Sequence, residues 1–358
     1  MKKQKTGKAK RIIKITALSL AGILLVSVIA AGFILRGRAA TMMSVKLVGD
    51  DLYTMRFQQD YHLDKALQAE IKSENDLLKF ICDDMFFGYQ IDANLEKYGC
   101  SAFITQTPDG KYLAGRNFGL GGSDTICVYT NPDDGYASIG TGSTDMLAVG
   151  EGNANATTSL WGRAALLGAP YILVDGMNEK GLTASLLDVN EGETHMHTGK
   201  PDLTVTMAIR LLLDRAATVQ EAVELLGGYD IHTGHGWTQH LFVADANGSA
   251  AVVEWGDNKM KVVESPICTN FRMTTPGLRG QYECLCDRFD TLHGALDKKP
   301  QNTAADAMEL LEAVKQEYTQ YGIFTEWSVV YNLTDFSVDY AVNMNYDKVY
   351  HLTPEDFC

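Results

Sequence analysis

A cysteine and an arginine that could act together stand at the two ends of one predicted hairpin. Residues 100–107 and 111–116 have the composition of short strands, and the Pro-Asp-Gly sequence at 108–110 supplies what a tight turn requires. Cys100 opens the first strand and Arg116 lies at the end of the second, so the hairpin brings thiol and guanidinium together. A nearby cation favours the thiolate, which is the nucleophilic form of cysteine. The alternative is a buried structural cysteine with an arginine on a surface turn.

The charge distribution argues against nucleic-acid binding. Residues 1–38 hold nine of the 31 Lys and Arg residues and no acid, which leaves 22 basic and 45 acidic residues for the rest of the chain. A body with that excess of carboxylates repels phosphates, and no basic patch with interleaved aromatic residues follows the N-terminus. The hydrophobic content of 46% is that of a globular chain with an ample core.

The seven cysteines do not form a recognisable framework. They are too few and too scattered for a disulfide scaffold in a chain of 358 residues. Cys284 and Cys286 are the closest pair, but no second pair or histidines stand at zinc-ligand spacing. Three histidines offer a rival arrangement, either a Cys-His hydrolase or a metal cluster: His232, His235 and His240. His232 and His235 lie in a glycine-rich stretch without a carboxylate at familiar ligand spacing, which disfavours a metal site.

The N-terminus has the pattern of a membrane anchor. Residues 15–35 contain no charge, and a helix of that length would span about 30 Å of hydrocarbon. Seven basic residues precede the segment, so the positive-inside rule puts residues 1–14, a basic tail, in the cytoplasm. We therefore predict a transmembrane signal anchor with the rest of the chain outside the cell. A cleaved signal peptide is the alternative, although its apolar core is usually only about 7–15 residues.

The periodicity changes abruptly at Gly99. Apolar residues recur at helical spacing in the segment 41–99, which predicts a helical pro-segment. From residue 100 onward, the sequence predicts short strands with glycine turns, then helices, then strands again. That order indicates a layered α+β domain over 100–358, with stacked sheets between helices. The predicted strands are 100–107, 111–116, 125–130, 136–140, 171–175, 182–188, 240–246, 250–256, 259–264, 266–270, 326–333 and 336–344, and the predicted helices are 203–217, 219–227, 281–296 and 303–319.

Four motifs in this order resemble one enzyme family. The first is Cys100-Ser101 with Asp109-Gly110 and Gly115-Arg116-Asn117, and the second is the sequence Asp-Gly-Met-Asn-Glu-Lys-Gly-Leu at 175–182. The others are Thr269-Asn270 and Asp287-Arg288-Phe289. Together they resemble the choloylglycine hydrolase family, with its bile-salt hydrolases and penicillin V acylases. They also resemble the acid-ceramidase-like amidases and the isopenicillin-N acyltransferases.

The resemblance implies a fold and a mechanism. These families are N-terminal-nucleophile hydrolases with a four-layer αββα sandwich, and they cleave linear, non-peptide amides of N-acyl compounds without a cofactor or metal. Carried over residue by residue, it implies a nucleophile at Cys100, active-site arginines at Arg116 and Arg288, and oxyanion-hole positions at Asp188 and Asn270. Because Cys100 is internal, the Gly99–Cys100 bond must be cut. The free α-amine, with a pKa near 7.7–8.0, then acts as the base.

Two positions depart from the family pattern. The family usually has an aspartate three residues after the first arginine, where this chain has Gly119, and the nearest carboxylate, Asp124, lies five residues further on. At the oxyanion position the family often has asparagine, whereas Asp188 is acidic. If only the backbone N–H is used, the acidic side chain is tolerable; otherwise Asn190 is the local substitute.

The sequence therefore predicts a membrane-anchored amide hydrolase with an extracellular catalytic domain. Its expected partners are a small N-acyl amide substrate and the membrane, and a homo-oligomer is compatible with the sequence. Two alternatives remain open. One is a membrane-tethered binding or scaffold protein that keeps the fold without turnover, and the other is an acyltransferase that uses the same acyl-enzyme.

Overall fold

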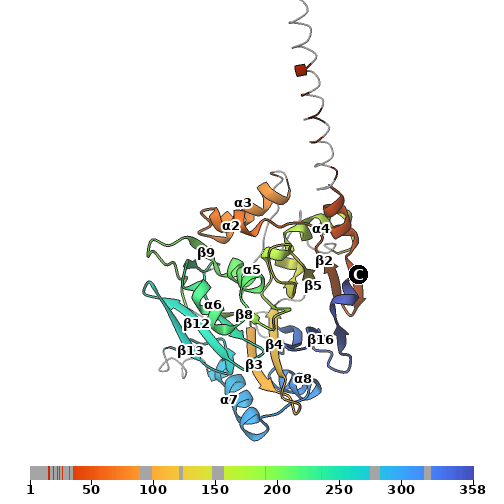
Figure 1. The fold of residues 1–358 in the computed structure, drawn as a ribbon. Coiled ribbons are helices and arrows are strands. Elements are labelled where there is room, and N and C mark those ends of the chain that lie inside the picture. Colours follow the sequence, from red (N-terminus) through yellow and green to blue (C-terminus); the bar gives the residue numbers. More distant parts are fainter. Residues whose placement is uncertain are drawn as a thin grey trace, which may run out of the picture.

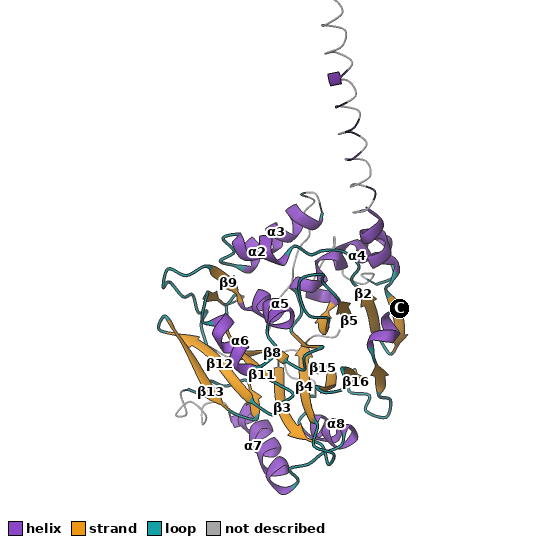
Figure 2. Ribbon diagram, in the orientation of Figure 1, coloured by secondary structure: helices purple, strands orange, loops and turns teal. Residues whose placement is uncertain are grey.

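The protein is described here from a computed structural model. The described residues are 35–86, 88, 99–120, 124–146, 157–189, 191–234, 236–274, 283–317 and 324–358, with a few isolated positions before residue 35. Two β-sheets stack in the middle of the described part, with helices on the outer face of each (Figures 1 and 2).

The sheet that carries the predicted hairpin has six antiparallel strands. Their order is β14 (Ile267–Thr269), β3 (Gly99–Gln106), β4 (Tyr112–Leu120), β15 (Phe324–Asn332), β16 (Ser337–Val342) and β17 (Tyr350–Leu352). The β3–β4 turn is the predicted one: Gly110 has φ +88°, and the Thr107 N–H donates to the Lys111 carbonyl over 2.8 Å. The predicted hairpin is confirmed, although β4 continues four residues beyond Arg116.

The second sheet has nine strands in the order β1-β2-β5-β6-β7-β8-β11-β12-β13. A glycine turn with φ +83° at Gly181 joins β7 to β8. Residues 171–175 do not form the predicted strand, because a 3-10 helix with Pro170 inside ends at Tyr171 and β7 begins only at Asp175. The bounds are β1 (Lys46–Gly49), β2 (Leu52–Arg56), β5 (Thr125–Thr130), β6 (Ser138–Ser143), β7 (Asp175–Asn178), β8 (Thr183–Val189), β11 (Thr238–Ala244), β12 (Ala250–Gly256) and β13 (Lys259–Glu264).

Helices cover both outer faces, as the predicted αββα sandwich requires. The helices α5 (Val205–Arg215) and α6 (Val219–Leu226) pack on the nine-stranded sheet, and α7 (Glu283–Lys298) and α8 (Ala304–Ala313) pack on the six-stranded sheet. Thr218 caps α6 by accepting from the Glu221 N–H, as its side-chain type predicts. Further elements after Gly99 are α4 (Leu160–Ala165), the short parallel pair β9 (Asp202–Thr204) and β10 (Asp230–His232), and the 3-10 turns 144–146, 166–171 and 354–357.

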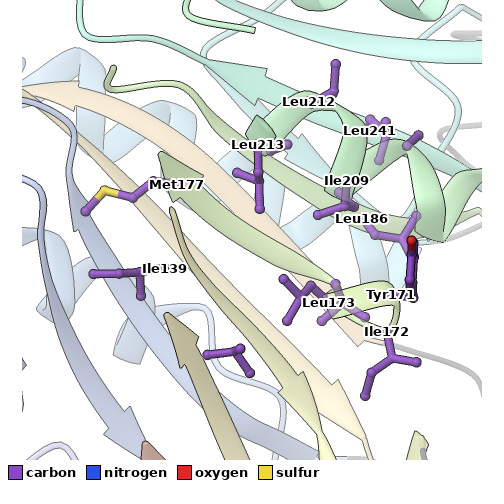
Figure 3. Close-up of a cluster of buried hydrophobic side chains, with 14 of the residues drawn as sticks. Ile139, Tyr171, Ile172, Leu173, Met177, Leu186, Ile209, Leu212, Leu213 and Leu241 are labelled. Atoms are coloured by element: carbon purple, nitrogen blue, oxygen red, sulfur yellow. The ribbon is translucent and has the colours of Figure 1, made fainter. Parts of the chain in front are cut away.

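A core of aliphatic side chains fixes α5 to the nine-stranded sheet (Figure 3). Figure 3 shows Ile209, Leu212 and Leu213 of α5 with side chains of the sheet strands and of the turn before β7. All of them are buried, and each fully buried Leu or Ile stabilises the fold by about 1.5–3 kcal/mol. This packing holds β7 and β8 in place, and β8 carries Asp188 of the predicted site.

The segment before Gly99 is not purely helical, which corrects the prediction for 41–99. It forms the antiparallel hairpin β1–β2 before the helices α2 (Leu63–Gln68) and α3 (Glu74–Met85). Strand β2 pairs in parallel with β5, so this hairpin extends the nine-stranded sheet. The prediction failed because helical spacing in the second half of the segment was extended to its first half, where Leu52 and Met55 are core residues of a strand.

The predicted transmembrane segment 15–35 falls mostly outside the described residues. Among the residues that are described, no helix is both long and apolar enough to cross a membrane.

Candidate active site

Cys100 lies inside a strand with its thiol fully buried. It is the second residue of β3 and pairs with Phe118 of β4, and the preceding Gly99 pairs with Gly119. The Gly99–Cys100 peptide is thus part of the sheet. Asn270, directly after β14, accepts the Cys100 N–H on its Oδ1 at 2.6 Å. The amide nitrogen that cleavage would turn into an amine is therefore already positioned by a side chain.

Arg116 lies on the same face of the β3–β4 hairpin as Cys100. It pairs with Ala102, two residues beyond Cys100, so the predicted approach of guanidinium and thiol is what the register produces. Its Nε donates to Asp175 of β7 at 3.3 Å, and its Nη2 donates to the Leu186 carbonyl of β8. The strand pairing and these contacts from the other sheet fix the guanidinium between the two layers.

Asp175 is a residue of this site that the sequence analysis did not assign. Its carboxylate is fully buried and accepts from Trp327 Nε1 at 3.2 Å and from the Tyr331 hydroxyl at 2.6 Å, both in β15. Its position at the start of the 175–182 motif is the only signal that could have identified it. Although burial opposes it, the Cys100 and Asp175 side chains raise the pKa of Arg116, so the guanidinium stays charged.

Arg288 contacts the nucleophile residue from the outer helix layer. From α7, its Nη1 donates to the Cys100 carbonyl at 2.6 Å and its Nη2 to Asn270 Oδ1 at 2.8 Å. Asn270 in turn donates through Nδ2 to the Asp188 carbonyl at 2.8 Å. The structure thus brings Cys100, Arg288, Asn270 and Asp188 into one connected hydrogen-bond network.

The backbone of Asp188 contacts the site, whereas its side chain bonds within the nine-stranded sheet. It lies in β8, where its carbonyl accepts from Asn270 and its Oδ1 accepts from Gln239 Nε2 at 3.1 Å. The Gln239 contact gives the carboxylate a partner within the nine-stranded sheet. Asn190, the local substitute, lies outside the described residues.

The electrostatic balance in the uncut chain favours the neutral thiol. Burial raises the pKa of Cys100, and the Asp188 carboxylate raises it further, whereas Arg116 and Arg288 lower it. The two arginines alone do not overcome the burial. Activation therefore needs either exposure of the thiol or a base beside it.

Gly119 is explained by its closeness to the uncut bond. A Cβ on residue 119 would lie 2.8 Å from the Gly99 carbonyl oxygen and 3.1 Å from the Phe324 carbonyl oxygen. No side chain fits there without a shift of the strands. Asp124 bonds instead to the Thr157 hydroxyl at 2.6 Å.

His232 and His240, two histidines of the rival arrangement, lie in separate places. His232 bonds to Asp202 through Nε2 at 2.8 Å and faces His195 at 3.3 Å between the Nδ1 atoms, whereas His240 lies beside Cys268. His235 is outside the described residues. Within the described ranges, no three His, Cys, Asp or Glu side chains are placed to hold a metal ion.

Comparisons with known proteins agree with this fold. Residues 158–329 match the family model of acyl-coenzyme A:6-aminopenicillanic acid acyl-transferases. A penicillin V acylase from Pectobacterium atrosepticum is 33% identical over 144 residues, and the match covers 37% of this chain and 38% of the acylase. The chain thus matches about two fifths of the length of that curated relative.

Solved structures extend the likeness to most of the body. A mutant of the conjugated bile acid hydrolase from Clostridium perfringens superposes with a TM-score of 0.55 at 17% identity, over 72% of this chain and 92% of the hydrolase. Penicillin V acylase from Agrobacterium tumefaciens gives 0.50 at 18% identity, over 72% and 88%. At such identities the structures establish the fold. Together with the sequence matches, they confirm the resemblance to the choloylglycine hydrolases and related N-terminal-nucleophile amidases.

Proposed function

We propose that this chain is a hydrolase of linear amides whose nucleophile is Cys100, freed by cleavage of the Gly99–Cys100 bond. The observation that carries the proposal is the network around that residue: Asn270 holds its nitrogen, and Arg288 holds its carbonyl. A buried structural cysteine does not need an arginine and an asparagine committed to its backbone. The similarity to a penicillin V acylase and to a conjugated bile acid hydrolase supports an amide as substrate.

The first step is cleavage of the chain by its own thiol. The Cys100 sulfur attacks the Gly99 carbonyl, a C–S bond forms, the C–N bond breaks, and the departing nitrogen takes the thiol proton. Water then hydrolyses the thioester to a Gly99 carboxylate and the free thiol. Gly99 has no side chain to hinder the attack, and its carbonyl faces the equally bare Gly119.

The second step is turnover of the substrate. The neutral α-amine of Cys100 takes the thiol proton, the thiolate attacks the substrate carbonyl, and the substrate's own amine leaves with that proton. Water, which gives a proton to the same α-amine, then hydrolyses the acyl-enzyme to the free acid and restores the thiol. Asn270 Nδ2 and the backbone N–H groups near Asp188 are the candidate oxyanion donors, each worth about 3 kcal/mol. Arg116 and Arg288 then favour the thiolate that the amine generates.

The N-terminal part should remain bound after the cut. Its strand β2 pairs with β5, its residues Leu52, Met55 and Ile81 are in the core, and the Tyr61 hydroxyl bonds to Asp214 of α5 at 2.7 Å. The active form is then a complex of two fragments. The β1–β2 hairpin would stay as part of the nine-stranded sheet.

Hydrolysis can be tested by exposing the purified protein to N-acyl amides of different acyl and amine groups. The panel would include a phenoxyacetyl penicillin, glycine- and taurine-conjugated bile acids, and N-acyl homoserine lactones. We expect release of the amine from at least one class and none with Cys100→Ser. Equal release by that variant would contradict the proposal, and a cut, folded protein that hydrolyses nothing would favour a binding role.

A second candidate is acyl transfer by the same acyl-enzyme. It is favoured by the family model, whose members are described as acyltransferases to 6-aminopenicillanic acid. In that reaction an amine replaces water in the last step. Adding 6-aminopenicillanic acid to a reaction with an acyl donor would give an acylated product under transfer and only the free acid under hydrolysis.

A further inference from the structure

Gln316 is a polar residue beside the Gly99–Cys100 bond that the mechanism above does not use. It follows α8, and two hydrogen bonds of 2.8 Å fix its backbone to Thr325 of β15: the Gln316 N–H donates to Thr325 Oγ1, and the Thr325 N–H donates to the Gln316 carbonyl. Thr325 pairs with Gly119, which itself pairs with Gly99. The backbone of Gln316 is therefore tied to the strands that flank the cleavage point.

The side-chain oxygen of Gln316 points at this junction. A Cβ built on Gly99 would overlap Gln316 Oε1, and one on Gly119 would lie 3.3 Å from it. The oxygen thus lies against the Cα of Gly99, two bonds from the Cys100 nitrogen. A side chain at position 119 would compete for the same space.

This oxygen has no hydrogen-bond partner within the described part of the chain, although it is buried. Buried acceptors are normally satisfied, and an unsatisfied acceptor costs free energy. In the uncut chain its neighbour is the Cα of Gly99, which offers no N–H or O–H. In the uncut chain, Gln316 Oε1 therefore lacks a hydrogen-bond donor beside Gly99.

Cleavage creates a donor there. The Cys100 nitrogen has one hydrogen in the peptide and donates it to Asn270 Oδ1, an oxygen that already accepts from Arg288. As an α-ammonium it carries three hydrogens, so it needs further acceptors. The departure of Gly99 removes the atoms between Gln316 Oε1 and this nitrogen.

We propose that Gln316 accepts a hydrogen bond from the α-amine of Cys100 once the Gly99–Cys100 bond is cut. This inference rests on the proposed function and names a further residue of its base. In this role Gln316 orients the amine beside the thiol and stabilises the ammonium that forms when the amine takes the thiol proton. Gly119 leaves the space that the amide needs.

The test compares Gln316→Met, which keeps the length but removes the acceptor, with Gln316→Glu, which adds a charge. The observable is the pH dependence of kcat/KM together with the pH dependence of labelling of the α-amine by an amine reagent. The amine must be neutral to act, so activity rises with pH through its pKa. Loss of an acceptor disfavours the ammonium, and a carboxylate favours it.

We expect Gln316→Met to move the rising part of the kcat/KM–pH profile about half a pH unit lower and to reduce kcat about tenfold. Gln316→Glu should move it to higher pH, and Gln220→Met, on the exposed face of α6, should change nothing. If Gln316→Met is not cut, an upward shift in the cut Glu variant still supports the inference.

The failures are distinguishable. This inference alone would be overturned by a cut, active Gln316→Met protein whose kcat/KM–pH profile and amine-labelling curve match those of the wild type. It would also be overturned if the Gln316→Met and Gln316→Glu proteins both fold but are never cut. A cut wild type without turnover would overturn the hydrolase, and the labelling curve would still test Gln316. A wild-type chain that stays uncut would overturn both.

Discussion

Two buried cysteines on adjacent strands of one sheet have opposite surroundings. Cys100 of β3 is contacted through its backbone by Asn270 and Arg288. Cys268 of β14 lies 3.3 Å from His240 Nε2, and His240 Nδ1 lies 3.2 Å from Glu254. Judged by residue types alone, Cys268 has the more familiar catalytic set, a Cys-His-Glu triad.

The hydrogen bonds show why the triad at Cys268 is structural. His240 Nε2 also lies 3.0 Å from the Thr269 carbonyl, so both ring nitrogens are engaged with groups that hold the fold together. Glu254 accepts from the N–H groups of Met273 and Thr274 at 2.6 and 3.0 Å. His240 and Glu254 thus bond to the backbone before and after Asn270.

The role of each cysteine depends on whether the polar groups around it are already engaged in hydrogen bonds that hold the fold together. Burial raises the pKa of both thiols and Arg116 lowers both, but Glu254 raises that of Cys268 further, whereas Arg288 is a second cation that lowers that of Cys100. Only Cys100 can gain a new base, because cleavage would turn its own nitrogen into an amine.

The largest expected difference is between the two thiols. Cys100→Ala should reduce kcat/KM for the amide substrate by about 1,000-fold or more, since it removes the nucleophile. Cys268→Ala should keep kcat/KM within about threefold, because its sulfur touches no reacting atom. A Cys268→Ala protein with a wild-type melting temperature and no activity would reverse the assignment.

The next effect concerns Asn270, which links the two regions. Asn270→Ala should reduce kcat about 100- to 1,000-fold, because it removes one oxyanion donor and one acceptor of the Cys100 nitrogen. Asn345→Ala is the matched control, since that asparagine is exposed and bonds only weakly to Asp50 at 3.3 Å. Steady-state kinetics on the cut protein measure both. An Asn270→Ala enzyme within tenfold of wild type would remove Asn270 from the oxyanion site.

The smallest effect is on stability and tests the structural role of Glu254. Burial alone would raise its pKa, but His240, Thr274 and the Met273 N–H lower it from 4.5 to about 2, which corresponds to about 3 kcal/mol of stability at pH 7. Because the folded pKa is depressed, this stabilisation is present above pH 4.5 and is lost as the pH falls towards 2. Denaturant unfolding at pH 7 and at pH 3 should therefore show a deficit for Glu254→Gln that shrinks at low pH.

The control for this measurement is Glu224→Gln, on the exposed face of α6, which should behave like wild type. A Glu254→Gln deficit that is the same at both pH values would mean that the charge of Glu254 does not stabilise the fold.

Local chemistry explains which parts of the fold the sequence predicts. The β3–β4 and β7–β8 hairpins depend on turn residues such as Gly110 and Gly181, and the start of α6 depends on its cap Thr218, so all three are visible in short stretches. The parallel pairing of β2 with β5 joins segments about 70 residues apart and has no local signal. The helical interpretation of 41–99 failed for this reason.

The candidate site shows the same limit. The motifs identified Cys100, Arg116, Asp188, Asn270 and Arg288, which the structure brings together. They did not identify Asp175 as the partner of Arg116, or Gln316 beside Gly99, because these contacts arise from packing between segments that are distant along the chain.

The most direct test of the account is the N-terminus of the purified protein. Intact mass and N-terminal sequencing of wild type and Cys100→Ala should give, for the wild type, a fragment that begins at Cys100 and copurifies with the part before it. The Cys100→Ala chain should stay in one piece. A folded wild-type chain with an intact Gly99–Cys100 bond, or an alanine variant cut at the same place, would contradict the central claim.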